Sequence, residues 1–203
     1  MVPVHALTGM GRFQAKDVFV AILLAGLVFY TGYRMSGGGG ACAPAFVPGG
    51  SDSAPASMTG TVAPAWELAA YDGRNLGSED FAGKTLVLNF WATYCGPCVQ
   101  ETQELAELER ELADPDLAVL GVVMDEPEAA AIKDYCARKE IDYPMLRGEE
   151  AVAERFGGIR MVPTTFVIAP DGRIAEVFEG RAEPGKLREA VRAAASGADL
   201  AQL

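Results

Sequence analysis

Short apolar runs alternate with longer amphipathic segments along most of this chain. Residues 85–91 and 117–124 are apolar at almost every position, which is typical of strands covered on both faces. Between them, residues 95–112 repeat leucines at helical spacing, so a helix is predicted there. Its leucines mark an inner face and its glutamates an outer, solvated face: Leu105, Leu108, Leu112 and Glu101, Glu104, Glu107, Glu111. The three segments predict a strand–helix–strand unit.

The same pattern predicts the other elements of an α/β fold. They are an edge strand at 65–71, a helical turn at 78–81, a helix opened by residues 126–128 with Pro127 in its first turn, a short helix at 149–156, a hairpin of strands 164–169 and 173–179, and a closing helix at 184–196. Strands interleaved with helices, followed by a hairpin and a last helix, predict a mixed central sheet with helices on both faces.

A separate apolar stretch lies near the N-terminus, at residues 18–34. Two basic residues precede it and one closes it. As a helix, its uncharged part spans about 24 Å, slightly less than a hydrocarbon core of about 30 Å, and flanking basic and tyrosine side chains cover the difference. We predict an uncleaved single-pass anchor, and the excess of basic residues before the stretch favours residues 1–17 as a cytoplasmic arm. A cleaved signal peptide and a lipoprotein signal at Cys42 are the alternatives.

The remainder divides into a linker and one folded domain. Residues 35–61 are rich in Gly, Ala, Ser and Pro and have no apolar period, so they predict a flexible tether. Residues 62–203 then form a single domain of ordinary size.

Charge and histidine content exclude several classes of function. A formal net charge of −11 at pH 7 argues against nucleic-acid binding and favours a monomeric domain. The single histidine, His5, lies in the N-terminal arm. This position removes histidine-ligated metal sites, histidine-based triads and cysteine–histidine proteases, so we expect no metal site.

The motif Cys95-Gly96-Pro97-Cys98 carries the candidate chemistry. Cys95 opens the helix that follows the strand at 85–91, where free N–H groups and the helix dipole favour a thiolate, and Cys98 lies one turn further along. We therefore predict Cys95 as the nucleophile and Cys98 as the resolving thiol of a redox pair. A zinc site would need a second cysteine pair of similar spacing, and the chain has none. A purely structural disulfide between these cysteines would close a loop too short to stabilise the fold much.

Two segments, residues 89–98 (NFWATYCGPC) and residues 161–174 (MVPTTFVIAPDGRI), carry a family resemblance. They resemble the thioredoxin superfamily, most of all its membrane-anchored TlpA/ResA-like branch. The first matches the active-site segment of that family, and the second matches the loop that carries a cis-proline facing the dithiol. The resemblance covers most of the predicted domain and implies a thioredoxin-like fold. It also implies that Pro163 is cis, and that Val162 and Thr164 beside it help to dock a substrate chain.

The chain departs from the family pattern at Asn89, where thioredoxin carries a buried aspartate. The proton acceptor for Cys98 must then come from elsewhere, and the carboxylates of Asp125 and Glu126, after the next strand, are the candidates. A helix-capping role is the alternative for both acids.

Tyr94 is a second departure, since tryptophan is more usual before the first cysteine. Trp91 and Tyr94 form either an apolar lip that docks partners, together with Gly96 and Pro97, or part of the core. Cys136, in the second predicted helix, is expected to fill the core.

The sequence thus predicts a thiol:disulfide oxidoreductase at the bacterial inner membrane, with its catalytic domain in the periplasm. We expect it to reduce disulfides in partner proteins, to draw electrons from a membrane thiol donor and to need no cofactor beyond its own cysteine pair. Apocytochrome c and copper-site proteins are the substrates that the resemblance implies. A copper-binding assembly chaperone that uses Cys95 and Cys98 as ligands is the alternative. A peroxidase would need a threonine where Ala92 stands.

Overall fold

The structure, a computed structural model, describes residues 55–197. The predicted anchor at 18–34 and the cysteine at position 42 lie outside these residues. Within the described part of the chain, no helix is both long enough and apolar enough to cross a membrane.

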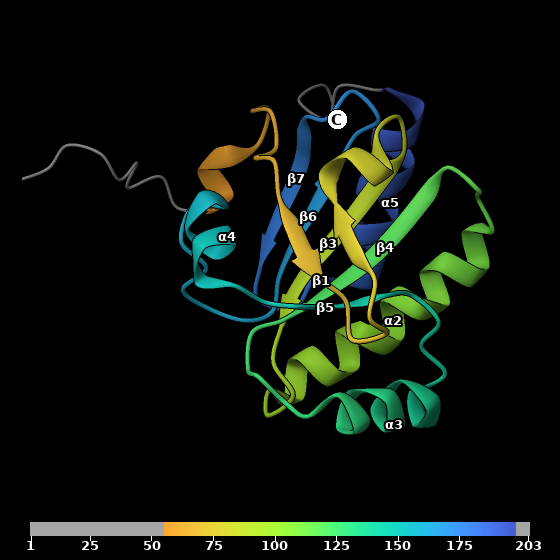
Figure 1. The fold of residues 1–203 in the computed structure, drawn as a ribbon. Coiled ribbons are helices and arrows are strands. Elements are labelled where there is room, and N and C mark those ends of the chain that lie inside the picture. Colours follow the sequence, from red (N-terminus) through yellow and green to blue (C-terminus); the bar gives the residue numbers. More distant parts are fainter. Residues whose placement is uncertain (1–54, 198–203) are drawn as a thin grey trace, which may run out of the picture. The chain divides into compact units, whose positions relative to one another are not determined.

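A mixed five-stranded sheet forms the centre of the domain, in the order β5-β4-β3-β6-β7 (Figure 1). The central strand β3 runs parallel to β4 and antiparallel to β6, β5 is parallel to β4, and β7 is antiparallel to β6. The strands are β3 (Thr85–Trp91), β4 (Leu117–Val123), β5 (Met145–Arg147), β6 (Thr164–Ile168) and β7 (Ile174–Glu179). This arrangement confirms the predicted thioredoxin-like α/β fold with a mixed central sheet.

Helices and a small hairpin cover the two faces of this sheet. The elements are η1 (Pro55–Met58), β1 (Glu67–Ala69), β2 (Asn75–Gly77), η2 (Ser78–Phe81), α2 (Gly96–Leu112), α3 (Ala129–Lys139), α4 (Glu150–Arg155) and α5 (Pro184–Ser196). Side chains of α2, α3 and α5 fill one core, and those of α4 and β1 fill the other. Figure 1 shows α4 on one side of the sheet and α2 and α3 on another.

The apolar run of β3 serves both cores. Val87 and Trp91 point into the core under α2, whereas Leu88 and Phe90 point into the core under α4. Because successive side chains of a strand face opposite ways, a strand between two cores must be apolar throughout. Asn89 shares the face of Val87 and Trp91, so its amide lies on the side of α2.

Three elements differ from the sequence prediction. The short strands β2 and β5 were not expected: each is three residues long, and each becomes a strand only by pairing with β1 and β4, respectively. Pro127 lies before α3 rather than in its first turn, because the helix begins at Ala129 after an N-cap at Glu128.

The folded domain also begins upstream of residue 62, where the sequence predicts tether. Pro55 is buried, the Gly60 amide donates to the Ile174 carbonyl at 2.7 Å, and Val62 pairs with Arg173. Residues 55–61 are therefore held against the edge of the sheet by backbone hydrogen bonds, which an apolar pattern does not record.

Candidate active site

The cysteine pair lies where β3 gives way to α2. Cys95 is the N-cap of α2, Pro97 occupies its first turn, and the Cys98 amide donates a hydrogen bond to Cys95 Sγ at 3.2 Å. The two cysteines form a disulfide, with their Cα atoms 5.2 Å apart. Cys98 is fully buried, whereas Cys95 is half-buried. This asymmetry is what a pair made of an attacking and a resolving thiol requires.

The loop before β6 faces this pair. The Val162–Pro163 peptide bond is cis, and the Val162 carbonyl oxygen lies 3.6 Å from Cys95 Sγ. The Thr164 hydroxyl donates to the Met161 carbonyl at 2.9 Å, which closes the turn on itself. Residues far apart in the chain therefore meet at Cys95.

The two aromatic residues before Cys95 have separate places. Trp91 is fully buried and stacks on Tyr135 of α3, with ring centroids 5.1 Å apart. Trp91 is therefore a core residue and is not part of an apolar lip around Cys95. Tyr94 is 80% exposed, and Met161, on the facing loop, is 51% exposed. Gly96 and Pro97 are exposed as well, so Tyr94, Pro97 and Met161 supply exposed apolar surface near Cys95.

Asp125, one of the two carboxylates proposed as proton acceptors, holds the dithiol loop. It accepts a hydrogen bond from the Thr93 amide at 2.9 Å and a second, short one from the Thr93 hydroxyl. Glu126 is exposed. The bonds of Asp125 thus reach the loop two residues before Cys95.

A buried carboxylate that the sequence prediction assigned to solvent is Glu101 of α2. Its side chain is fully buried. It accepts hydrogen bonds from Asn89 Nδ2 at 3.3 Å, from the Thr165 hydroxyl at 2.5 Å and from the Ala182 amide at 3.1 Å. Burial raises the pKa of this carboxyl above its ordinary value, although the bonds from Thr165 and Ala182 oppose the shift.

Helical spacing could have located Glu101. Cys98, Glu101, Leu105 and Leu108 follow one another at intervals of three or four residues, which places them on a single face of α2. Leu105 and Leu108 are buried, and the glutamate between them and Cys98 is buried on the same face. It therefore lies one helical turn from the resolving cysteine.

Cys136 is the one free cysteine among the described residues. It is half-buried on α3, and burial raises the pKa of its thiol. Such a thiol is protonated at neutral pH and reacts slowly.

A family model for the AhpC/TSA family matches residues 59–177. The chain belongs to this family. The thiol-disulfide oxidoreductase ResA of Bacillus thuringiensis subsp. konkukian is 26% identical over 130 residues, which cover 64% of this chain and 75% of that protein. The thioredoxin-like protein YneN of Bacillus subtilis is 28% identical over 167 residues, or 81% of this chain and 91% of YneN.

Solved structures agree with these relatives. A thiol:disulfide interchange protein of the thioredoxin family from Chlorobium tepidum has a TM-score of 0.60 and 27% identity, covering 66% of this chain and 95% of its own. A secreted thiol-disulfide isomerase from Corynebacterium glutamicum has a TM-score of 0.59 and 25% identity, covering 63% and 81%. With its Cys95–Cys98 disulfide and thioredoxin-like fold, this chain is a thiol:disulfide oxidoreductase.

Proposed function

We propose that this enzyme reduces disulfides in partner proteins at the outer face of a bacterial inner membrane. The observation that carries the exchange chemistry is the asymmetry of the cysteine pair: Cys95 is half-buried and faces the Val162 carbonyl, while Cys98 is fully buried. Gly96 and Pro97 between the cysteines resemble thioredoxin, a reductant, whereas strong oxidants of the superfamily usually carry a histidine there.

The reaction proceeds through two exchanges of sulfur–sulfur bonds. The Cys95 thiolate attacks one sulfur of the partner's disulfide, and a mixed disulfide forms as the partner's other sulfur leaves as a thiolate. The Cys98 thiolate then attacks Cys95 Sγ, which breaks the bond to the partner and closes the Cys95–Cys98 disulfide. Two electrons pass to the partner, and the two protons that the dithiol loses end on the partner's two sulfurs.

Cys98 needs a base because a buried thiol does not ionise readily. We assign this role to Glu101 in place of Asp125 and Glu126. Glu101 lies on the same face of α2, one turn from Cys98, and its carboxylate is buried with it. Asp125 accepts hydrogen bonds from the amide and the hydroxyl of Thr93, so we propose that it positions the dithiol loop.

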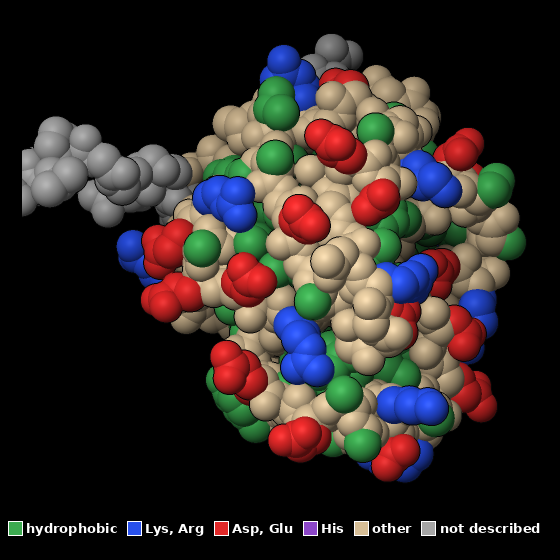
Figure 2. Space-filling view, viewed as in Figure 1, with side chains coloured by type: hydrophobic (Ala, Val, Ile, Leu, Met, Phe, Trp, Pro, Cys, Tyr) green, Lys and Arg blue, Asp and Glu red, His purple; other side chains and the backbone are tan. Residues whose placement is uncertain are grey.

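The anchor at 18–34 and the tether after it would hold the domain near the membrane with some reach. In an oxidising compartment the Cys95–Cys98 disulfide must be reduced again after each turnover, so a membrane thiol donor of electrons is part of the proposal. Apocytochrome c and copper-site proteins are its proposed substrates, and the acidic domain is proposed to act as a monomer. On the face in Figure 2, Lys and Arg side chains lie among Asp and Glu side chains and form no basic stripe for a nucleic acid.

The copper-chaperone alternative would gain support from a third ligand beside the two sulfurs. Among residues 55–197, no three His, Cys, Asp or Glu side chains are grouped so as to hold a metal ion. The reductase scheme also gives the buried Glu101 carboxylate a role, which a copper site of two sulfurs does not need.

The reduction potential of the Cys95–Cys98 pair tests the direction of electron flow. Equilibrating the full chain against glutathione and dithiothreitol buffers should give a value below about −200 mV, in the range of thioredoxin and glutaredoxin. A value near about −120 mV, as in strong disulfide-forming catalysts, would make the enzyme an oxidant instead.

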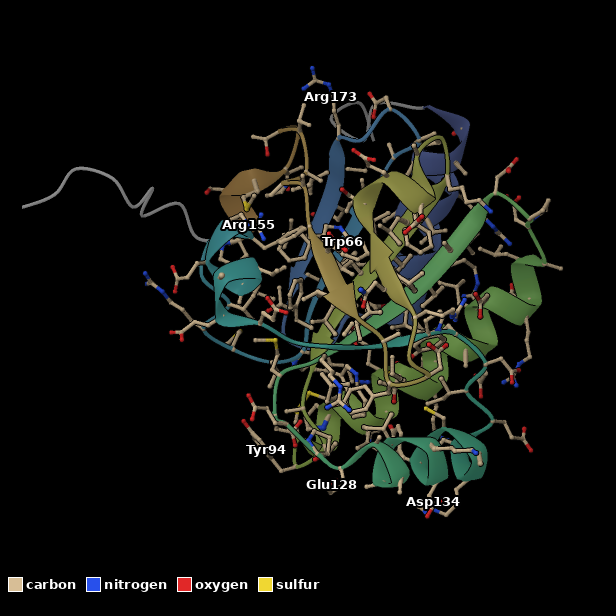
Figure 3. The ribbon with its side chains drawn as sticks, viewed as in Figure 1. Trp66, Tyr94, Glu128, Asp134, Arg155 and Arg173 are labelled. Carbon is tan, nitrogen blue, oxygen red and sulfur yellow. A yellow bond between two sulfur atoms is a disulfide. The ribbon has the colours of Figure 1, made fainter. Side chains whose placement is uncertain are left out.

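Replacing Tyr94 with serine should weaken the docking of protein substrates. The exposed ring beside Cys95 would lose its apolar contact with a partner, so kcat/KM for a protein disulfide should fall about tenfold relative to kcat/KM for a small aromatic disulfide. Val62→Ser is the matched control, because Val62 is an exposed apolar residue paired with Arg173. Figure 3 shows Tyr94 and Arg173 at opposite ends of the domain. An equal loss in the two variants would refute a docking role for Tyr94.

A further inference from the structure

Every described partner of the Glu101 carboxylate donates a hydrogen bond to it. Asn89 and Thr165 reach one oxygen, Oε1, and the Ala182 amide reaches the other, Oε2. Three donors suit an ionised carboxylate, which only accepts hydrogen bonds. A base that takes a proton from Cys98, however, must also exist for a time in its protonated form, and that form needs an acceptor for its new O–H.

The cluster holds one spare acceptor. Asn89 Oδ1 is buried and accepts no hydrogen bond from any described residue. On the other end of the same amide, Asn89 Nδ2 donates to the Thr165 hydroxyl at 2.8 Å and to Glu101. The strand register sets this geometry, since Asn89 of β3 stands directly opposite Thr165 of β6. A buried acceptor left unpaired costs free energy, so its presence beside an ionisable group calls for a reason.

We propose that Asn89 and Thr165 are positioning residues that form a reversible hydrogen-bond relay, so that Glu101 is fully bonded both with and without the proton of Cys98. The relay deepens the proposed function and rests on it, because Glu101 is the base for Cys98 in that scheme.

With Glu101 ionised, the bonds run as the structure has them. Asn89 Nδ2 donates to Thr165, and the Thr165 hydroxyl donates to Glu101. With Glu101 protonated, rotation of the Asn89 side-chain amide by about 180° puts Oδ1 where Nδ2 was, a turn that this torsion tolerates. The Glu101 O–H then donates to Thr165 Oγ1, and the Thr165 hydroxyl donates to Asn89 Oδ1. No proton leaves the cluster through the relay. Two bonds reverse direction, the 3.3 Å bond from Asn89 Nδ2 to Glu101 is given up, and Nδ2 takes the place that Oδ1 had.

The relay explains why an amide, and not a carboxylate, suits position 89. An aspartate there would set two acidic groups around one hydroxyl, and the pair would hold a shared proton more tightly. Other charged or titratable groups that interact with Glu101 are Glu104 on α2, Arg181 beside Ala182, and Tyr143. Arg181 is paired with Glu104, so the two largely offset each other at Glu101.

Nuclear magnetic resonance of the oxidised full chain tests the relay without reference to activity. The ¹³Cδ signal of Glu101 and the side-chain ¹⁵N–¹H signals of Asn89 are followed from about pH 4 to about pH 10. We expect both to change with one common midpoint, and we expect the Asn89 change to vanish in Glu101→Gln. Asn89 signals that stay constant while Glu101 titrates would overturn the relay, and so would a Glu101 carboxyl that does not titrate in this range.

Two variants test the effect of the relay on the rate of disulfide closure. Asn89→Asp and Thr165→Val should each slow the closing of the Cys95–Cys98 disulfide about tenfold at neutral pH and move its pH profile to higher pH. Thr85→Val is the matched control: Thr85 is also a buried strand threonine, but it makes no hydrogen bond to Glu101. A loss of stability in Thr165→Val with no movement of its pH profile would also overturn the relay. If the two signals titrate together but the chain reduces no disulfide, the proposed function fails while the relay stands.

Discussion

Replacing Cys95 with serine is expected to lower the rate of disulfide reduction by about three orders of magnitude, to the uncatalysed background. Cys95 is the only sulfur of the pair that a partner can reach, because Cys98 is fully buried. The measurement is turnover of a protein disulfide with dithiothreitol as the electron source, using the full chain.

Cys98→Ser separates attack from resolution in the same assay. Cys95 can still attack, but nothing breaks the mixed disulfide, so a covalent complex with the substrate should accumulate and should disappear on reduction. Cys136→Ser is the control, since burial raises the pKa of the Cys136 thiol, and this variant should keep wild-type turnover. Turnover that survives in Cys95→Ser would refute the assignment of the nucleophile.

Glu101→Gln should have the second largest effect, a fall in the resolution rate of about a hundredfold at neutral pH. The amide keeps the size of the side chain but cannot take the proton of Cys98. In the wild type, burial raises the pKa of Glu101, so the rate should climb as pH rises through that value, and the variant should lack this limb. Stopped-flow measurement of mixed-disulfide decay against pH gives the profile.

Glu107→Gln is the matched control for Glu101→Gln. It is the same substitution on the same helix, but Glu107 is exposed. Its rate and pH profile should equal those of the wild type. A Glu101→Gln profile that keeps the wild-type limb would show that another group is the base, with Asp125 the next to test.

The free energy of unfolding should also depend on pH through the Glu101 carboxyl. Because the folded-state pKa of Glu101 lies above its unfolded value, the folded chain holds this proton over a wider pH range than the unfolded chain. The stabilisation that the protonated Glu101 gives to the folded chain is therefore fully present below the ordinary glutamate pKa, and it is lost as pH rises through the folded-state pKa. The free energy of unfolding of the wild type, measured by urea denaturation, should fall relative to Glu101→Gln over that window.

The chain's apolar pattern located most of the fold because it reports burial directly. The continuous apolar run of β3 and the leucine spacing of α2 predicted both elements, and the cysteine motif between them placed the dithiol. The pattern missed β2 and β5, because strands of three residues carry too few positions to show a period and exist only through pairing with β1 and β4.

The sequence by itself determined the chemistry: two thiols one helical turn apart at a helix start, behind a strand buried on both faces. It could not decide which polar groups surround them. Whether Glu101 faces water or the core depends on α5 and β6 packing over its side of α2, and the partners of its carboxylate come from Asn89, Thr165 and Ala182. Only tertiary structure brings those groups together, since a hydrogen bond between distant residues leaves no period in the chain.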